Sequence, residues 1–207
     1  MELTPYYNSL YEYVYSINRK GEVKLNGELF DLLRSGGYIL YVRHGEATVG
    51  EDQPDLNFLY CITQRNLSEM GRRQAIYYGQ ILRNYQIPIS YPVLTSPFCR
   101  TIETARLVFG TANVQIDPFW FQVYRLSGNL TVAEQRRILE SLYSRLEGIP
   151  PQVSNRVVVG HSFPRGIGLG QISDMGTVII RPLGQGNGYE IVSKLSLSDL
   201  ANLPRYR

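Results

Sequence analysis

The sequence predicts an α/β fold: a three-layer α/β/α sandwich around a mainly parallel sheet, with an antiparallel hairpin near the C-terminus. Two observations predict it. From residue 38 onward, short apolar runs of strand length alternate with longer amphipathic segments of helical period. Closer to the C-terminus, two apolar runs within residues 176–195 instead flank an Asn-Gly turn signal at residues 187–188.

Four apolar runs account for the parallel part of the sheet. Each has the length of a buried strand and is bounded by polar residues, glycine or proline. The runs are residues 38–42, 91–96, 113–116 and 156–161.

The helices between these strands have recognisable starts. Residues 67–86 carry Ser68 as an N-cap, and residues 131–148 open with a Thr-x-x-Glu capping box. The helix after strand 91–96 is expected to have Ser96 as its N-cap and Pro97 at its first position.

The chain of 207 residues suits one domain with an appendage. Residues 1–36 are predicted to be a helical appendage and residues 37–207 the main domain. Within the appendage, residues 28–37 form a short helix ended by glycine. A second helix is indicated by an apolar stripe at i, i+3, i+4 and i+7, formed by Tyr7, Leu10, Tyr11 and Val14.

Composition excludes several classes of protein. A net charge of +3 is too small to indicate a nucleic-acid binder, and no apolar run approaches the ~18 residues of a membrane span. The N-terminus lacks the pattern of a secretory signal. Cys61 and Cys99 fit no metal-ligand spacing, and two cysteines make no disulfide framework. We therefore expect a cytoplasmic protein that binds neither nucleic acid nor membrane, with its oligomeric state open.

The chemically interesting residues follow predicted strands. Arg43 and His44 come after the first strand, Ser96 to Arg100 after the second, and His161 after the last, although the chain has only two histidines. In parallel α/β sheets, ligands bind at the carboxyl ends of the strands. The three stretches are therefore expected to meet in one site.

Two histidines and two arginines in one site indicate phosphoryl chemistry. A neutral imidazole nitrogen is a good nucleophile near pH 7. Arg43 and Arg100 would neutralise the charge on the three equatorial phosphoryl oxygens, and a protonated His161 would assist them. The start of the helix after Ser96 would add amide donors. This chemistry requires neither a metal nor another cofactor.

Four motifs in this order carry a family resemblance: RHGEAT, LSEMGRRQA, LTSPFCRTIETA and VVVGHS. They resemble the histidine phosphatase superfamily, which has the phosphoglycerate mutase-like fold, over about residues 37–200. The resemblance implies that His44 is the phosphorylated nucleophile. It also implies that Arg43, Arg100 and His161 form the phosphate pocket, as charge and placement indicate independently.

The sequence departs from the family at the general acid. Many members carry a glutamate in a strand-Asp-x-x-Leu-x-Glu pattern. Here Asp117 and Trp120 fill the Asp and Leu places, and Gln122 stands where the acid would be. An amide cannot donate that proton. Four other carboxylates remain candidates, with Glu103 the best among Glu46, Glu103, Asp117 and Asp174.

The substrate-facing loop is predicted at residues 50–66, directly after the nucleophile. Arg65 and Asn66 within it are expected to reach an anion, and Glu103 and Ser162 are further candidate substrate contacts. The family's mutases carry an asparagine-rich, tryptophan-containing stretch after RHG, which this chain lacks. Hydrolysis is therefore favoured over mutation. The expected substrate is a phosphorylated small molecule, a peptidic phosphohistidine or an aryl phosphate.

A non-catalytic protein of the same fold that binds a phosphorylated ligand stays open, as does a phosphomutase. A Ser-His-Asp hydrolase with Ser162 as nucleophile fails. Pro164 replaces the glycine of its Gly-x-Ser-x-Gly turn, and no histidine follows His161 in the chain.

Overall fold

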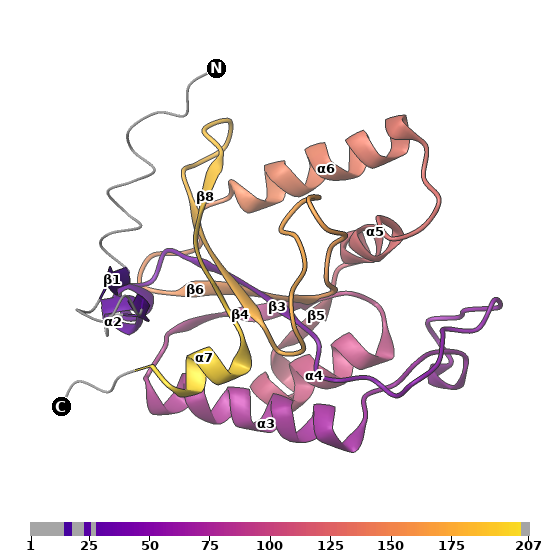
Figure 1. The fold of residues 1–207 in the computed structure, drawn as a ribbon, viewed down its shortest axis with the longest axis horizontal. Helices are drawn as coiled ribbons and strands as arrows, with labels where there is room; N and C mark the ends of the chain where they lie inside the picture. The colour runs from indigo at the N-terminus through magenta and orange to yellow at the C-terminus, as the bar shows by residue number, and fades with distance from the viewer. Residues whose placement is uncertain (1–14, 18–22, 26–27, 204–207) are drawn as a thin grey trace.

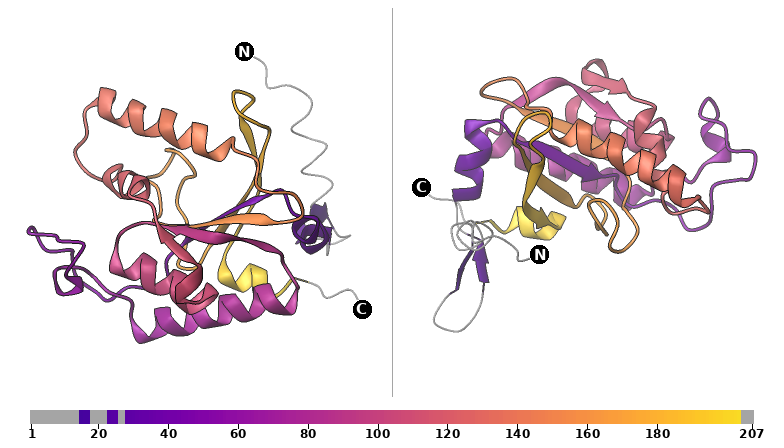
Figure 2. Two further views of the ribbon diagram at one scale, coloured as in Figure 1. Left: turned by 180° about the vertical axis from the view of Figure 1, so that it is seen from behind. Right: turned by 90° about the horizontal axis from the view of Figure 1, so that it is seen from above.

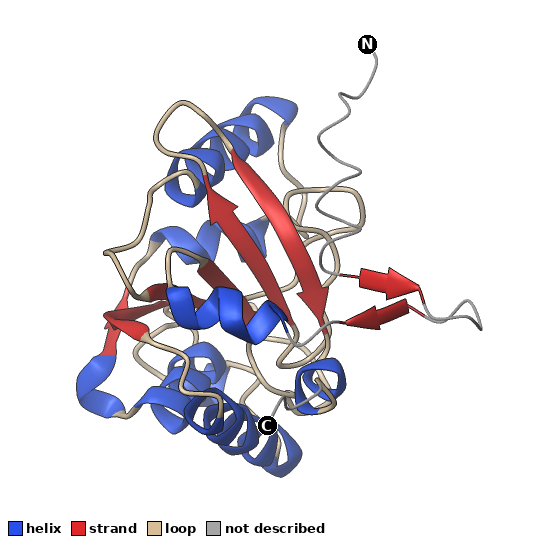
Figure 3. Ribbon diagram, turned by 90° about the vertical axis from the view of Figure 1, so that its left-hand side faces the viewer, coloured by secondary structure: helices blue, strands red, loops and turns tan. Residues whose placement is uncertain are grey.

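The computed structural model describes residues 15–17, 23–25 and 28–203. The apolar stripe predicted at Tyr7 to Val14 lies outside the described residues. Near it, β1 (Tyr15–Ile17) and β2 (Val23–Leu25) pair antiparallel and protrude from the body of the molecule (Figures 2 and 3).

The main sheet has six strands in the order β5-β4-β6-β3-β7-β8 (Figure 1). Its members are β3 (Ile39–Arg43), β4 (Ile89–Thr95), β5 (Val114–Ile116), β6 (Asn155–Gly160), β7 (Thr177–Pro182) and β8 (Tyr189–Leu195). The strands from β5 to β3 are parallel, and β7 and β8 add an antiparallel hairpin. The predicted fold class is confirmed.

Helices cover both faces of this sheet (Figure 1). On one face lie α3 (Glu69–Asn84), α4 (Cys99–Phe109) and α7 (Leu197–Ala201), and on the other lie α5 (Phe119–Arg125) and α6 (Val132–Leu146). Helix α2 (Glu28–Ser35) precedes β3. Short 3-10 turns are η1 (Cys61–Thr63) and η2 (Thr111–Asn113).

Strand β3 shows why the sheet needs two helical layers. Successive side chains of a strand point to opposite faces. Leu40 and Val42 enter the core beneath α3 and α4, whereas Ile39 and Tyr41 enter the core beneath α5 and α6. Residues 39–42 are therefore all apolar, and the site is set at the end of a central strand.

Most predicted helix starts are correct. Ser68 accepts a hydrogen bond from the N–H of Gly71, and α6 begins with the predicted capping box at Thr131. The start predicted at Ser96 is wrong, because α4 begins at Cys99 with Phe98 as its N-cap. The Ser96 hydroxyl instead bonds to a side chain in the site, described below.

Helix α2 belongs to the main core, although the sequence analysis assigned it to the appendage. Leu29, Phe30 and Leu33 are buried with residues of β3 and β6, and the Phe30 ring stacks on Tyr85 at a centroid distance of 3.5 Å. The packing therefore favours a domain boundary before Glu28 rather than at residue 37. Among the described helices, none is long and apolar enough to cross a bilayer.

The turn after β3 packs against the first turn of α3 so closely that no side chain fits between them. A Cβ atom on Gly71 would lie 2.0 Å from the backbone oxygen of Glu46, and a Cβ on Gly45 would lie 2.5 Å from the backbone oxygen of Gly71. Backbone atoms on both sides make this contact, so a rotamer change cannot relieve it. Both glycines are needed to hold the turn that carries His44.

We expect Gly71→Ala to destabilise the protein by about 3 kcal/mol, as overpacking does, although alanine normally favours a helix over glycine. Urea unfolding would measure the change. Gly128→Ala is the control, because its Cβ would meet only the Arg125 carbonyl oxygen, at 3.4 Å. Equal stability of Gly71→Ala and the unmodified protein would contradict this account of the turn.

Candidate active site

The carboxyl ends of three parallel strands bring the two histidines together. β4, β6 and β3 are neighbours in the sheet, so the residues that follow them share one edge. The rings of His44 and His161 are both buried, and their centroids lie 5.5 Å apart, edge to face. The predicted meeting of these strand ends is confirmed in the fold.

The hydrogen bonding of His44 defines which ring nitrogen is free to react. Its Nδ1 lies 2.7 Å from the carbonyl oxygen of Gly45, which can only accept, so Nδ1 carries the proton. The lone pair is then on Nε2. Burial, together with the charge of Arg100, lowers the pKa of His44 to about 3. The ring is therefore neutral at physiological pH, as a nucleophile requires.

His161 is fixed from several sides. Its backbone N–H donates to the Tyr41 hydroxyl at 3.0 Å, and that hydroxyl donates to the His161 carbonyl at 2.9 Å. Its Nε2 lies 2.9 Å from the Ser96 hydroxyl. Burial and the neighbouring His44 ring hold the pKa of His161 well below its usual value. The second imidazole is therefore also neutral.

The two arginines differ in how they are held. Arg43 donates to the carbonyl of Ile172 at 2.8 Å and pairs with Asp174 at 3.0 Å, while its buried Nε has no partner among the described residues. The side chain of Arg100 is only 4% exposed. Its guanidinium also lies over the Phe98 ring, 4.1 Å from the centroid.

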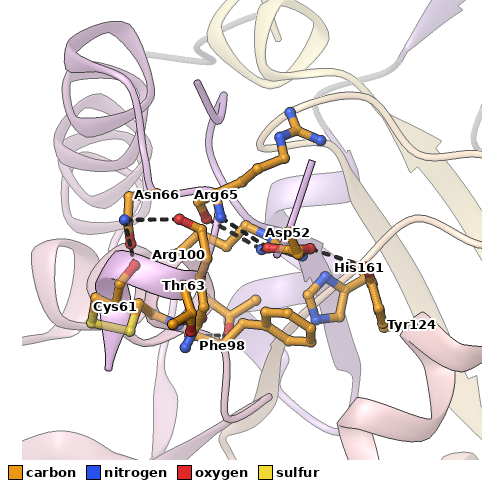
Figure 4. Close-up of polar contacts among 12 residues, drawn as sticks. Asp52, Cys61, Thr63, Arg65, Asn66, Phe98, Arg100, Tyr124 and His161 are labelled. Carbon is orange, nitrogen blue, oxygen red and sulfur yellow. Dashed lines mark hydrogen bonds and ion pairs between the residues drawn. A yellow bond between two sulfur atoms is a disulfide. The ribbon is translucent and has the colours of Figure 1, made fainter. Parts of the chain in front are cut away.

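Asp52 is the site residue that sequence reasoning missed. Its carboxylate accepts from both terminal nitrogens of Arg100, at 2.8 and 3.2 Å. It also accepts from the backbone N–H of Arg65 at 2.8 Å and from the Tyr124 hydroxyl at 3.0 Å (Figure 4). The sequence predicts that residues 50–66 face substrate, but no pattern within this segment distinguishes Asp52 from its exposed neighbours.

The segment carrying Asp52 protrudes from the body of the molecule (Figures 1 and 2) and is anchored by a disulfide between Cys61 and Cys99. The sequence analysis predicts no disulfide framework from two cysteines, whereas the structure pairs them in one disulfide. The two residues lie 38 positions apart, and only the fold brings the loop onto the start of α4. Since disulfides persist in oxidising compartments, cysteine usage no longer argues for the cytoplasm.

The four predicted substrate-binding residues have partners within the protein. The Arg65 side chain donates to the Thr48 carbonyl, and the Asn66 amide donates to the carbonyls of Cys61 and Gln64. The other two are also engaged: Glu103 accepts from Arg72 at 2.6 Å, and the Ser162 hydroxyl accepts from the Ile172 N–H. The backbone N–H of Arg65 also donates to the Asp52 carboxylate.

Each carboxylate named as a candidate acid is engaged elsewhere. Asp117 pairs with Arg145, and Asp174 with Arg43. Glu46 accepts from Ser68, and Glu103 is held by Arg72 as described. On α5, the Gln122 side chain accepts from Arg125 at 2.9 Å. The carboxylate that contacts Arg100 is instead that of Asp52.

The site thus combines a doubly covered α/β sheet with paired histidines and an arginine at the strand ends. Residues 39–119 match the model of the histidine phosphatase superfamily, branch 1. Over these residues the chain is similar to members of that superfamily.

Solved structures agree with the fold. The α-ribazole phosphatase of Shigella flexneri is 16% identical with a TM-score of 0.53, over 77% of this chain and 96% of that one. The protein histidine phosphatase SixA, complexed with tungstate, is 16% identical with a TM-score of 0.50, over 79% and 99%. Among curated proteins, none matches this sequence.

The two buried neutral histidines make stability depend on pH. Both have pKa values below the usual 6.5, so the unfolded chain binds more protons than the folded one as pH falls through 6.5. Each histidine should then cost up to about 1.4 kcal/mol per pH unit below that point. Unfolding free energy should thus fall between pH 7 and pH 5, and less steeply in His161→Gln. Equal slopes in the two proteins would contradict the assignment of a buried, neutral His161.

Proposed function

We propose that the protein is a metal-independent phosphatase that works through a phosphohistidine at His44. The observation that carries the proposal is the contact of His44 Nδ1 with the Gly45 carbonyl in a buried ring, which leaves the lone pair on Nε2. Hydrolysis needs such a nucleophile and positive charge around the phosphoryl oxygens.

The reaction divides into two displacements. In the first, Nε2 of His44 attacks phosphorus, an N–P bond forms, and the P–O bond to the leaving group breaks. In the second, water attacks phosphorus, the N–P bond breaks, and inorganic phosphate leaves while His44 returns to its neutral form. Charge on the transferring group is balanced by Arg100, by Arg43 and by His161, which a bound phosphate would favour in its protonated form.

Release of phosphate from an aryl phosphate, with a chelator present, tests this function. We expect turnover by the purified chain that the chelator does not reduce. A panel of phosphorylated metabolites and a phosphohistidine peptide would then define the substrate. A chain that binds phosphate yet releases none from any of these compounds would instead be the non-catalytic ligand-binding protein. Transfer of the phosphoryl group to a second sugar or acid would indicate a mutase.

The place of Gln122 predicts a preference among leaving groups. An alkyl phosphate needs a proton at the departing oxygen, whereas an aryl phosphate or a phosphohistidine needs little help. Since Gln122 cannot supply that proton, we expect aryl and phosphohistidine substrates to be favoured over sugar phosphates. Gln122→Glu should raise the rate of alkyl phosphate cleavage, measured as the rate constant of the chemical step under single-turnover conditions.

Glu103→Gln is the control for that experiment, because its carboxylate is held by Arg72 and should not supply the proton. If the unmodified protein cleaves alkyl and aryl phosphates at similar rates while chemistry limits turnover, the prediction is wrong. An acid then exists elsewhere in the site.

A further inference from the structure

Arg100 is not an open phosphate receptor, because the Asp52 carboxylate occupies its two terminal nitrogens. The pair lies in a nearly closed setting, with side chains 4% and 8% exposed. The two Arg100 terminal nitrogens, which a phosphate would use for a paired contact, both point to Asp52. Figure 4 shows the carboxylate between Arg100 and Tyr124, next to His161.

The hydrogen bonds of Asp52 show that it acts as an anion and not as an acid. A carboxylate has about four lone-pair positions, and four donors use them here. Oδ1 accepts from Arg100 and from the Arg65 N–H, while Oδ2 accepts from Arg100 and from the Tyr124 hydroxyl. The guanidinium of Arg100 and the backbone N–H of Arg65 can only donate to it. Burial alone would raise the pKa of Asp52, but these hydrogen bonds and the Arg100 charge lower it.

The donors around Asp52 form a receptor for any oxyanion of this size. A guanidinium, a backbone N–H and a hydroxyl converge on two oxygen atoms, and two oxygens of a phosphate would satisfy them equally. The pairing also explains how a buried guanidinium is tolerated before substrate arrives, since an isolated buried charge is costly. A second anion cannot join the first on the same two nitrogens without strong repulsion.

We propose that Asp52 is an internal counter-ion that the phosphate of the substrate must displace from Arg100. Asp52 is then a positioning residue: it keeps the guanidinium folded into the site, and it sets the threshold for anion binding by competing for the same donors. This inference rests on the proposed function, in that the incoming anion is the substrate's phosphate. Asp174 differs, because it is half-exposed and pairs with Arg43 through one nitrogen.

Anchoring of the loop makes the competition effective. The segment carrying Asp52 is tied to the start of α4 by the Cys61–Cys99 disulfide, one residue before Arg100. Gln53 donates its N–H to the Thr63 carbonyl, which adds a second tie within the loop. The carboxylate is therefore held beside its partner at a high effective concentration.

Titration calorimetry of the full chain with inorganic phosphate and with vanadate tests the proposal. In Asp52→Asn, an amide group can no longer accept from both Arg100 nitrogens, so the competitor is lost. We expect Asp52→Asn to bind phosphate at least about tenfold more tightly than the unmodified protein. Its KM for an aryl phosphate should fall in parallel, with kcat unchanged within roughly threefold.

Asp55→Asn is the matched control, because it removes an exposed carboxylate from the same loop and should leave phosphate affinity unchanged. If Asp52→Asn does not fold, Asp52→Ala measured by phosphate-induced thermal stabilisation replaces it, with a larger shift expected than in the unmodified protein. Equal or weaker phosphate binding by the Asp52 variants overturns the proposal. A fall in kcat by about 100-fold with unchanged KM also overturns it, since that is the mark of a general acid. Tight phosphate binding without turnover in any variant would instead refute the proposed phosphatase activity alone.

Discussion

His44→Ala should reduce turnover of an aryl phosphate by at least about four orders of magnitude, because it removes the ring nitrogen that would accept the phosphoryl group. His161 faces His44 but has its Nε2 against the Ser96 hydroxyl. The rate of phosphate release measures the loss, in an assay sensitive enough to detect less than one turnover per protein molecule. Inorganic phosphate should still bind to this variant, since Arg43 and Arg100 remain.

His161→Ala is the informative companion to His44→Ala. It removes a group that would stabilise charge, so we expect a loss of about 100- to 1000-fold in kcat, as for one preorganised donor. The intermediate should still form. Turnover by His44→Ala at a rate equal to or above that of His161→Ala would show that the roles of the two histidines are reversed or shared.

Arg100→Ala should cost about 2–4 kcal/mol in kcat/KM and should weaken inhibition by phosphate and vanadate. The guanidinium is buried at the start of α4, beside His161 and over Phe98, so no surface arginine can take its place. The variant also leaves the Asp52 carboxylate buried without its counter-ion. Part of the loss will therefore appear as a lower unfolding free energy.

Two further variants separate these effects. Arg106→Ala removes an exposed arginine from the same helix and should change neither activity nor phosphate inhibition. The double variant Arg100→Ala with Asp52→Ala removes both charges, and should recover stability without recovering activity. Phosphate inhibition that persists unchanged in Arg100→Ala would place this arginine outside the phosphate site.

The arrangement of the sheet and its site-bearing edge could be predicted because the relevant signals are local. β3 and β6 each contain a buried apolar run, residues 39–42 and 157–159, and each strand is followed directly by a histidine. The Asn-Gly turn at 187–188 fixed the hairpin of β7 and β8 in the same way. These patterns depend on residues close in the chain, so one sequence suffices to recognise them.

The start of α4 was mispredicted for a tertiary reason. Serine followed by proline is a common helix opening, but here the Ser96 hydroxyl bonds to His161, 65 residues away in sequence. Gln64 then caps the helix from outside, its side-chain oxygen accepting from the N–H of Cys99. The residues around Ser96 in the sequence do not indicate contacts with His161 or Gln64, which are distant in the chain.

Asp52 and the disulfide were missed because both depend on how one irregular loop folds back. Helices and strands can be predicted from the period of their apolar residues, but an irregular loop has no such period. Asp52 reaches Arg100 across 48 positions and Tyr124 across 72. Only after the loop is placed on α4 does a polar loop residue become the counter-ion of a buried arginine.

Direct detection of the phosphorylated intermediate tests the central claim most plainly. The protein, labelled with nitrogen-15 at histidine, would be mixed with an aryl phosphate, quenched with alkali and examined by phosphorus-31 NMR. The account predicts one phosphohistidine, bonded through Nε2, that is acid-labile, alkali-stable and absent from His44→Ala. Phosphate bonded through Nδ1, or a label that persists in His44→Ala, would contradict it.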